Sequence, residues 1–296
     1  MKNTFSVVIV TFHSEEIIES TIKDLEGLDI VVIECSNNLK LKDKILSINK
    51  DINFIPSSDN LGYSAGNNLG IKNTKYDDIL IINPDTILNN RNKKSLINYI
   101  NTIDDYGILC PNLQSEECFS FSKKNNFLPT LVDWKSIGGG LISGCALLLN
   151  KSKLGEDVFF DENIFIYKED TDMIKRANDK NINVYYLPNC SVNHKGTSSH
   201  NKKYNFEIEI SRQFHWPYGN VYFYIKHFGY LYAIKKWGRK FISSIFKTLI
   251  YFLIFNNKYK IYFSRFLGIS SAFLKLKSWY RPKIKTDEIK QKNKNI

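Results

Sequence analysis

The first 85 residues alternate short apolar runs with segments of helical periodicity. The runs at 6–10, 30–34, 52–55 and 79–82 are rich in valine and isoleucine, and the segments between them repeat apolar residues at helical spacing. Uninterrupted apolar runs are typical of strands covered on both faces, and strand–helix–strand repeats connect by right-handed crossovers. The sequence therefore predicts an α/β fold with a mixed, mostly parallel sheet flanked by helices.

The same pattern continues further along the chain. It predicts a helix near 92–103, strands near 108, at 143–149 and at 182–187, and a helix starting at the acidic residues 169–172. Ser14, followed by two glutamates, predicts an earlier helix start. Gly144 indicates a close approach of another group to the strand at 143–149. The segment 113–137 has no clear pattern.

The fourth apolar run ends at Asn83-Pro84-Asp85. Proline lacks the N–H that a sheet requires and biases the residue before it to an extended conformation. Asp85 is thus expected at the carboxyl end of a buried strand, where open α/β sheets bind ligands. The preceding stretch 60–67, rich in glycine and asparagine, predicts a loop. We therefore interpret this edge as a site for a diphosphate and its cation. An ordinary Asn-Pro-Asp turn is the simpler interpretation.

The charge of the chain is divided unevenly along its 296 residues. Residues 1–210 carry 23 Lys and Arg against 28 Asp and Glu, a net charge of −5, whereas residues 211–296 carry 18 against 2, a net charge of +16. The latter part also holds 22 of the 41 aromatic residues. Two parts of such different composition are expected to face different partners.

The ends and cysteines of the chain indicate its compartment. The apolar run after the N-terminus is too short for a cleavable signal. An odd number of cysteines without a CxxC pair favours a reducing compartment and buried apolar roles; they are Cys35, Cys110, Cys118, Cys145 and Cys190. Residues 286–296 are polar and are expected to be disordered.

Six blocks in the first 200 residues, in this order, match a known family. They are SVVIVTFHSEEII, NLGYSAGNNLGI, NPDT, SGCALLL, FDENIFIYKEDTDMIKR and VNHKGTSS. On these blocks the chain resembles the family-2 glycosyltransferases with the GT-A (nucleotide-diphospho-sugar transferase) fold, and among them the rhamnosyltransferase-like group. The resemblance implies a GT-A domain over residues 1–210. It also implies inverting transfer of a sugar, such as rhamnose or another deoxyhexose, from a nucleotide-diphosphate donor with a divalent cation.

The resemblance also implies roles for individual residues. Asp85 and His194 are the expected ligands of Mg²⁺ or Mn²⁺. Asp170 matches the family's base, a carboxylate that takes the proton of the acceptor hydroxyl. Capping of a helix by Glu169, Asp170 and Asp172 is the simpler interpretation, and it is compatible with the first. The expected donor-binding residues are Thr11, Glu16, Glu34, Asn60, Gly62, Gly66, Asn67, Asn83 and Asp85.

Two positions depart from the family's usual pattern. The DxD motif is replaced by Asn83-Pro84-Asp85, which leaves one certain carboxylate ligand. The second strand ends in Glu34 rather than in Asp-Asn, which leaves the identity of the nucleotide base open. Ser143 and Gly144 are expected in the wall around the donor sugar or the acceptor.

Residues 211–285 predict a basic, aromatic and helical region. Between 240 and 253, Ile242, Ile245, Phe246, Leu249 and Leu253 fall on one helical face, with lysines and serines on the other. The run is too short to span a bilayer, so we expect a helix lying on an anionic membrane surface. Packing of this region on the catalytic part is the alternative. Nucleic-acid binding is disfavoured, because the acidic part of the chain would repel phosphates.

The sequence as a whole predicts a cytoplasmic enzyme, peripheral on the inner face of the cell membrane. It would add a sugar to a glycan acceptor on a lipid carrier during synthesis of a cell-surface polysaccharide. The alternative is a non-catalytic module that binds a sugar nucleotide or a glycan. An oxidoreductase with a dinucleotide site is disfavoured, because no GxGxxG follows the first strand.

Overall fold

The computed structural model describes residues 4–114, 128–138, 143–194 and 205–282. It divides into two compact units. One, here called the sheet unit, comprises residues 1–161 and 170–201; the other, the helical unit, comprises residues 162–169 and 202–296. The expected boundary at residue 210 falls inside a helix, and the expected disordered tail 286–296 and Cys118 lie outside the described residues.

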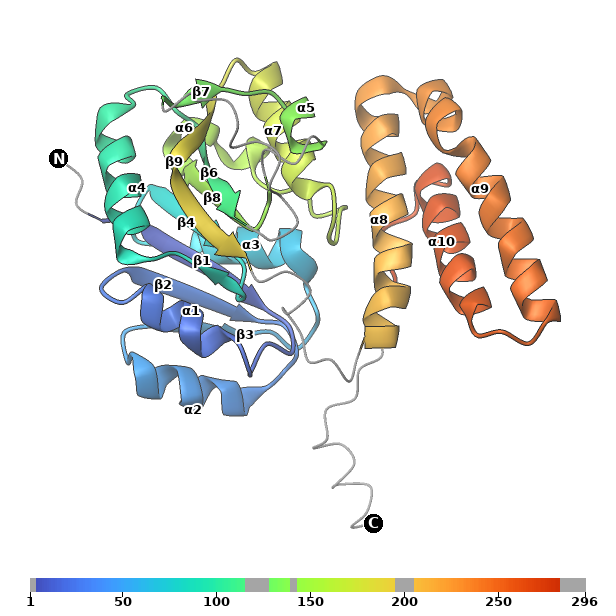
Figure 1. Cartoon of the computed structure of the whole chain (residues 1–296), viewed down its shortest axis with the longest axis horizontal. Coiled ribbons are helices and arrows are strands. Elements are labelled where there is room, and N and C mark those ends of the chain that lie inside the picture. The colour runs from blue at the N-terminus through green and yellow to red at the C-terminus, as the bar shows by residue number, and fades with distance from the viewer. Residues whose placement is uncertain (1–3, 115–127, 139–142, 195–204, 283–296) are drawn as a thin grey trace, which may run out of the picture. The chain divides into compact units, whose positions relative to one another are not determined.

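A nine-stranded sheet forms the centre of the sheet unit (Figure 1). Its order is β3-β2-β1-β4-β8-β6-β9-β5, and β7 also pairs with β9. The bounds are β1 (Ser6–Thr11), β2 (Asp29–Glu34), β3 (Asn53–Pro56), β4 (Asp78–Ile82), β5 (Thr86–Ile87), β6 (Ile108–Gln114), β7 (Thr130–Leu131), β8 (Ala146–Asn150) and β9 (Val184–His194).

The predicted α/β architecture with a mixed sheet is confirmed, although its parallel part is smaller than expected. Strands β3, β2, β1 and β4 are parallel neighbours, and so are β6 and β9. Strand β8 lies between β4 and β6 and runs antiparallel to both. Both β5 and β7 are antiparallel to β9, so four of the eight pairings among the described strands are antiparallel.

Alternate residues of β1 point to two apolar layers on opposite faces of the sheet. Val7 and Ile9 pack with α1 (Ile18–Asp24), α2 (Leu39–Ile48) and α4 (Asn90–Thr102). Val8 packs with α3 (Gly62–Lys72) and α7 (Glu169–Asp179) on the other face. The short elements α5 (Lys135–Gly138), α6 (Lys151–Leu154) and η1 (Glu156–Val158) complete the unit.

Two features of the core follow the sequence closely. All five residues of β4 are buried, as the apolar run predicts. The four described cysteines, Cys35, Cys110, Cys145 and Cys190, are buried free thiols, as expected.

The helix start at Ser14 was placed too early, because α1 begins at Ile18. The carbonyl of Ser14 instead accepts hydrogen bonds from Ile17 and Ile18, both at 3.2 Å, and so closes a turn before the helix.

Three helices form the helical unit, namely α8 (Asn205–Phe228), α9 (Tyr230–Leu253) and α10 (Lys258–Phe273) (Figure 1). Their shared core consists of Phe214, Tyr218, Val221, Trp237, Ile269 and Ala272. Among the described residues, every helix is too short or too polar to cross a lipid bilayer.

Helix α3 approaches β1 through two glycines. A Cβ atom on Gly70 would lie 2.2 Å from Cγ1 of Val8, and one on Gly66 would lie 2.9 Å from Cγ1 of Val10. Both gaps are shorter than side-chain contacts allow. The glycines therefore set how closely α3 packs on the sheet.

We expect Gly70→Ala to lower the free energy of unfolding by about 1–3 kcal/mol, because the added methyl group overpacks the core. Gly66→Ala should cost less, since its gap is wider; the preference of about 1 kcal/mol for alanine over glycine in a helix applies to both positions. Urea denaturation of both variants measures the difference. If Gly70→Ala were as stable as the wild type, this account of the packing would be wrong.

Candidate active site

The turn after β4 is held from three directions. The Thr86 amide donates to the carbonyl of Asn83 at 3.1 Å and closes the turn around Pro84. The Asn83 amide donates to the carbonyl of Cys145 at 2.9 Å, and the Thr21 hydroxyl donates to the carbonyl of Pro84 at 2.7 Å. Asp85 is thereby placed at the carboxyl end of β4, as predicted. The turn and the candidate ligand are the same feature, so the two interpretations do not exclude each other.

The pairing of β5 with β9 brings Asp85 and His194 together. Thr86 is the register partner of His194, so the residue before Thr86 lies beside the imidazole. Nε2 of His194 is 3.2 Å from Oδ1 of Asp85, and the two side chains are 22% and 0% exposed. The two residues expected to bind a cation are therefore neighbours, although 108 positions separate them along the chain.

The carboxylate of Asp85 is buried and lacks hydrogen-bond donors. Within the described ranges, neither of its oxygens accepts a hydrogen bond, including from the nearby His194. A buried carboxylate without donors is costly unless another charge compensates it. Carboxylate and imidazole together suit a divalent transition-metal ion and, with phosphate oxygens, Mg²⁺. These two groups fit a cation that is also held by a ligand.

The described residues do not form a metal site from protein ligands alone. No group of three or more His, Cys, Asp or Glu residues able to hold a metal occurs in the described part of the chain. Magnesium is commonly bound by one or two carboxylates together with substrate phosphates. Asp85 and His194 fit a site of this kind, in which the protein supplies a few ligands of the cation and the phosphates of a substrate supply the others.

The second candidate carboxylate, Asp170, lies in the first turn of α7 and is held by three hydrogen bonds. Its Oδ2 accepts from the Gly144 amide at 3.1 Å. Its Oδ1 accepts from the amide of Thr171 at 2.6 Å and from its hydroxyl at 3.1 Å. A carboxylate has about four acceptor positions, so one remains for a further donor. The side chain is partly exposed, which allows a ligand to reach it.

Another group lies close to the backbone of Gly144, as the glycine at this position predicted. A Cβ atom there would lie 2.9 Å from Oδ2 of Asp170. The carbonyl of Gly144 accepts a hydrogen bond from the Tyr63 hydroxyl at 2.6 Å, which ties it to α3. Tyr63 was not among the predicted residues, although it stands in the block NLGYSAGNNLGI that carries the resemblance.

A buried cysteine lies near both carboxylates. Burial chiefly, and then the charges of Asp85 and Asp170, raise the pKa of the Cys145 thiol to about 12. The Cys145 carbonyl also accepts a hydrogen bond from the Asn83 amide of the Asp85 turn, and the adjacent Gly144 amide donates to Asp170. The two residues just before β8 thus link the two acidic residues that the sequence predicted for different roles.

Three residues expected to bind the donor lie near the ends of the first two strands, namely Thr11, Glu16 and Glu34, and they differ in burial. Thr11 and Glu34 are register partners, and both are buried. The carboxylate of Glu34 accepts hydrogen bonds from the amides of Ser36 and Asn38, each at 2.8 Å. It therefore fixes the loop after β2. Glu16 is exposed in the turn before α1.

The expected loop 60–67 is mostly helical, because α3 begins at Gly62. Asn60 closes a turn just before this start, since its Oδ1 accepts from the Gly62 amide at 3.1 Å, and Gly62 has a φ of 76°. Gly66 faces Val10 of the sheet and so has a packing role. The side-chain Nδ2 of Asn67 donates to the carbonyl of Tyr63 at 2.9 Å, while its buried Oδ1 has no hydrogen-bond partner within the described ranges.

Asp172 has the structural role that the capping interpretation allowed. It is fully buried, and its Oδ2 accepts from Nε of Arg176 at 2.7 Å. The other guanidinium nitrogens of Arg176 donate to the carbonyls of Asp157 and Phe159 at 2.7 and 2.6 Å. The i,i+4 spacing of Asp172 and Arg176 is a sequence signal for the ion pair, whereas the two carbonyls, 19 and 17 positions away, are brought to Arg176 by the tertiary fold.

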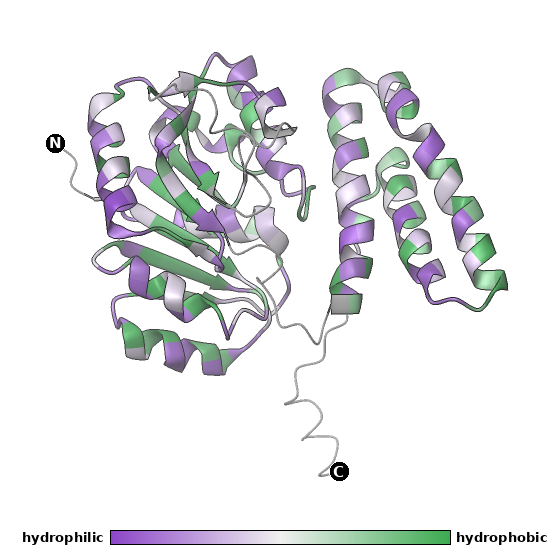
Figure 2. Cartoon of the chain, viewed as in Figure 1, coloured by the Kyte–Doolittle hydropathy of each residue, from purple (hydrophilic) through white to green (hydrophobic). Residues whose placement is uncertain are grey.

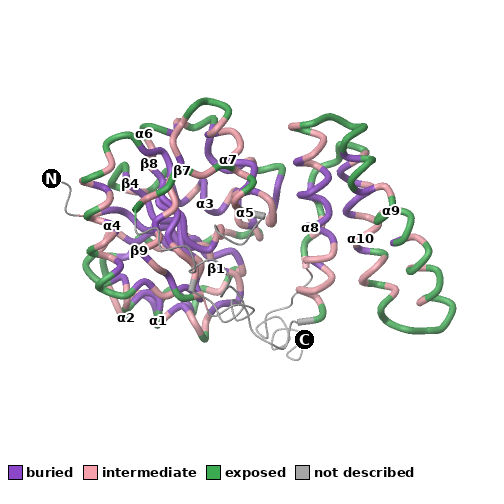
Figure 3. Tube along the Cα trace, turned by 45° about the horizontal axis from the view of Figure 1, so that its top comes forward, coloured by how far each residue is buried: buried purple, intermediate pink, exposed green. Residues whose placement is uncertain are grey.

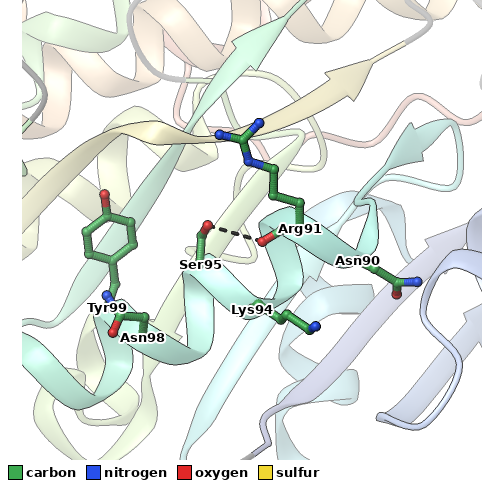
Figure 4. Close-up of a pocket in the computed structure, with 6 residues that line it drawn as sticks. All are labelled: Asn90, Arg91, Lys94, Ser95, Asn98 and Tyr99. Carbon is green, nitrogen blue, oxygen red and sulfur yellow. Dashed lines mark hydrogen bonds between the residues drawn. The ribbon is translucent and has the colours of Figure 1, made fainter.

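A hollow of about 600 Å³ lies elsewhere, along α4 (Figure 4). Its lining residues all come from this helix, and they are Asn90, Arg91, Lys94, Ser95, Asn98 and Tyr99. The Ser95 hydroxyl donates to the carbonyl of Arg91 at 3.1 Å. None of these residues was predicted to bind a ligand, and we assign the hollow no part in the site.

Solved structures with a similar architecture show which fold this chain has. The structure of S. aureus TarS 1–349 matches with a TM-score of 0.54 and 14% identity, over 94% of this chain and 93% of that one. The mannosyltransferase PcManGT from Pyrobaculum calidifontis, in complex with GDP-Man and Mn²⁺, matches with a TM-score of 0.51 and 10% identity, over 92% and 86% of the two chains. At these identities the likeness shows the fold alone, which is of the GT-A type.

The family follows from the sequence comparison. The model of glycosyl transferase family 2 matches residues 6–156, just over half of the chain. The chain therefore belongs to glycosyl transferase family 2, as the resemblance implied. A curated relative, the low-salt glycan biosynthesis hexosyltransferase Agl10 of Haloferax volcanii, is 26% identical over 203 residues. The match covers 62% of this chain and 64% of that relative, so the chain spans less than two thirds of the relative's length.

We expect Gly144→Ala to lower the free energy of unfolding by about 1–3 kcal/mol, because its methyl group would displace the Asp170 carboxylate. In the double variant with Asp170→Ala the loss should be smaller than the sum of the single losses, since the displaced oxygens are gone. Urea denaturation of the four proteins measures this coupling. Strictly additive losses would show that the glycine does not serve Asp170.

Proposed function

We propose that this chain is an inverting, cation-dependent glycosyltransferase that moves a sugar from a nucleotide-diphosphate donor to a glycan acceptor. The observation that carries the proposal is that adjacent residues hold both carboxylates, since Gly144 donates to Asp170 and the Cys145 carbonyl binds the turn that carries Asp85. Asp85 is buried beside His194 and suits a cation, whereas Asp170 is partly exposed and retains an open acceptor position. One site with both groups suits transfer from a charged leaving group to a hydroxyl.

The similar proteins support the donor class. TarS has been solved in complex with UDP-GlcNAc, and PcManGT in complex with GDP-Man and Mn²⁺. The Haloferax volcanii relative is a hexosyltransferase of glycan biosynthesis. We extend these properties to this chain as part of the proposal. Rhamnose or another deoxyhexose remains the sugar we expect, and a lipid-linked glycan the acceptor.

Asp85 and His194 would hold the cation at the carboxyl end of β4. A bound divalent cation would neutralise the charge that develops on the diphosphate as the sugar leaves. The turn bonds from Thr21 and Thr86 keep Asp85 in place. These residues would therefore act on the donor half of the reaction.

Asp170 would act on the acceptor half. As the acceptor oxygen attacks C1 of the sugar from the face opposite the diphosphate, its proton would pass to the carboxylate of Asp170. The hydrogen bonds from Gly144 and Thr171 fix the direction of that carboxylate. The base is thereby oriented before the substrates bind, which is how positioned groups lower a barrier.

At the nucleotide end, the role of Glu34 would be indirect. Its carboxylate accepts hydrogen bonds from the amides of Ser36 and Asn38, so it sets the backbone of that loop. We propose that the loop, with the end of β1 at Thr11, contacts the nucleotide through backbone groups. This arrangement explains how a glutamate can replace the usual Asp-Asn at this position.

We also propose that the helical unit lies on the inner, cytoplasmic face of a membrane. The C-terminal half of α9 is rich in apolar residues (Figure 2), and much of it is exposed (Figure 3). Phe246, Leu253 and Phe255 are 61%, 73% and 95% exposed, whereas Ser244 on the packed side is 1% exposed. A helix that only packed in a globular unit would bury its apolar face instead. An apolar face turned outward suits an acyl boundary.

Charge complementarity favours an anionic bilayer as the occupant of this face. Residues 211–296 carry a net charge of +16. Nζ of Lys240 lies 4.2 Å from the ring centroid of Trp237, and Nζ of Lys247 lies 5.1 Å from that of Tyr262. Lysines beside aromatic rings are typical of surfaces that meet lipid headgroups.

The membrane proposal predicts that full-length protein sediments with vesicles containing phosphatidylglycerol at low salt. The double variant Phe252→Ser/Phe255→Ser should reduce the binding constant at least about tenfold, because two phenylalanines lose their burial in lipid. Leu39→Ser, an exposed apolar residue of the sheet unit, is the matched control. Wild-type protein that stays in the supernatant at low salt would refute the proposal.

The enzymatic proposal is tested by incubating the chain with a panel of nucleotide-diphosphate sugars, with and without EDTA. We expect cation-dependent release of the nucleoside diphosphate from one donor, and a product whose anomeric configuration is inverted. A non-catalytic module would bind a donor without consuming it.

Asp170→Asn should leave donor binding within about twofold and reduce transfer by about 10²- to 10⁴-fold, because the base is lost while the donor half is intact. Asp179→Asn, on the exposed end of the same helix, is the control and should remain active. Calorimetry gives the donor affinity, and product analysis gives the rate. Substantial activity in Asp170→Asn would rule out this residue as the base.

A further inference from the structure

The residues directly before Asp170 belong to the helical unit. Residues 162–169 group with residues 202–296, whereas Asp170 itself belongs to the sheet unit. The segment 162–169 is therefore held by α8 and the residues after α10, and it leads directly into the candidate base. This connection gives the helical unit a means of acting on Asp170 through the chain itself.

The ring of Phe165 anchors the segment. It is 6% exposed and stacks on the His215 ring, with centroids 4.5 Å apart and planes 27° apart. Cζ of Arg281 lies 3.9 Å from the centroid of the Phe165 ring. Nδ1 of His215 is 2.8 Å from the Ser278 hydroxyl, and Nε2 is 3.0 Å from the carbonyl of Tyr280. Phe165 is thus enclosed by residues that are themselves fixed.

The imidazole of His215 serves this anchor as a neutral ring. Burial chiefly, and then the charge of Arg281, lower its pKa to about 3. It therefore carries no charge near neutral pH, and Phe165 stacks on it as on another aromatic ring.

Two residues beyond Phe165, the backbone takes an unusual path. Tyr167 and Lys168 have φ values of 69° and 88°. Non-glycine residues rarely adopt positive φ, and they keep it only where the surroundings hold them. Nζ of Lys168 lies 5.5 Å from the centroid of the Phe223 ring on α8. The unusual path immediately precedes Glu169 and Asp170.

Gly219 of α8 makes room for this path. A Cβ atom on Gly219 would lie 2.2 Å from the carbonyl oxygen of Tyr167 and 3.2 Å from Cβ of Lys168. Glycine within a helix is less favourable than alanine, so the close approach of the segment gives a reason for it. By contrast, a Cβ atom on Gly238 of α9 would meet only Ile234, at 3.7 Å.

We propose that Gly219 and Phe165 are positioning residues for Asp170. Through them α8 fixes the backbone of Tyr167 and Lys168, and so sets where α7 begins and where the carboxylate of Asp170, its second residue, points. The catalytic consequence rests on the proposed function, in which Asp170 is the base. Displacing a reacting group by about 1 Å can reduce a rate about 100-fold.

The test compares three glycine-to-alanine variants of the full chain. Gly219→Ala disturbs the segment. Gly268→Ala places a Cβ atom 2.1 Å from the carbonyl oxygen of Phe214, so it disturbs the packing of α10 on α8 instead. Gly238→Ala is the neutral control. For each variant, kcat and the donor KM are measured for transfer, and the unfolding temperature is measured by calorimetry.

We expect kcat to fall about 10- to 100-fold in Gly219→Ala, while the donor KM stays within about twofold because the donor residues belong to the sheet unit. Gly268→Ala should lower the unfolding temperature by a comparable amount and keep kcat within about threefold. Equal losses of kcat in these two variants would overturn the proposal, because the effect would then follow stability alone.

Hydrogen exchange provides a readout that needs no donor. The amides of residues 162–172 should exchange faster in Gly219→Ala than in Gly268→Ala or Gly238→Ala. If Gly219→Ala does not fold, Phe165→Leu is measured in the same two ways, and it should reduce kcat and speed exchange. Unchanged exchange in the folded variants overturns the positioning role. A wild-type chain that transfers no sugar refutes the proposed function, and the exchange result still decides this inference.

Discussion

The site depends on the contact between Asp85 and His194. Neither residue reaches the other through local structure, because β4 and β9 are separated by 101 residues of chain. The two-residue strand β5 makes the connection, since its pairing with β9 sets Thr86 opposite His194. A buried carboxylate without hydrogen-bond donors is costly to fold. The fold retains it beside an imidazole, which is the arrangement a cation would stabilise.

The two carboxylates of the site are held in different ways. Asp85 sits on a turn fixed by backbone bonds, and no described residue donates a hydrogen bond to it. Asp170 is fixed by donors from Gly144 and Thr171. In the proposed reaction, the first meets a cation and the second meets the proton of a hydroxyl. The helical unit would contribute to the second through residues 162–169, in addition to its proposed place on a membrane.

The sequence predicted those parts of the fold that local chemistry decides. The apolar run of β4, the break at Pro84 and the close approach at Gly144 all follow from the residues themselves. The direction of β8 and the start of α3 inside the expected loop depend on tertiary contacts, which periodicity does not encode. The direction of the Glu34 side chain also depends on tertiary structure, because its carboxylate binds backbone amides of the loop after β2.

In the proposed site, Asp85 and His194 hold a divalent cation together with a nucleoside diphosphate. Electron paramagnetic resonance of Mn²⁺ measures this directly, because the signal of the free ion falls when it binds. With UDP or GDP present, we expect the wild-type chain and Asp179→Asn to bind Mn²⁺. Asp85→Asn should lose this binding, and His194→Ala should weaken it about 10- to 100-fold. Binding of Mn²⁺ to Asp85→Asn with wild-type affinity would contradict the account.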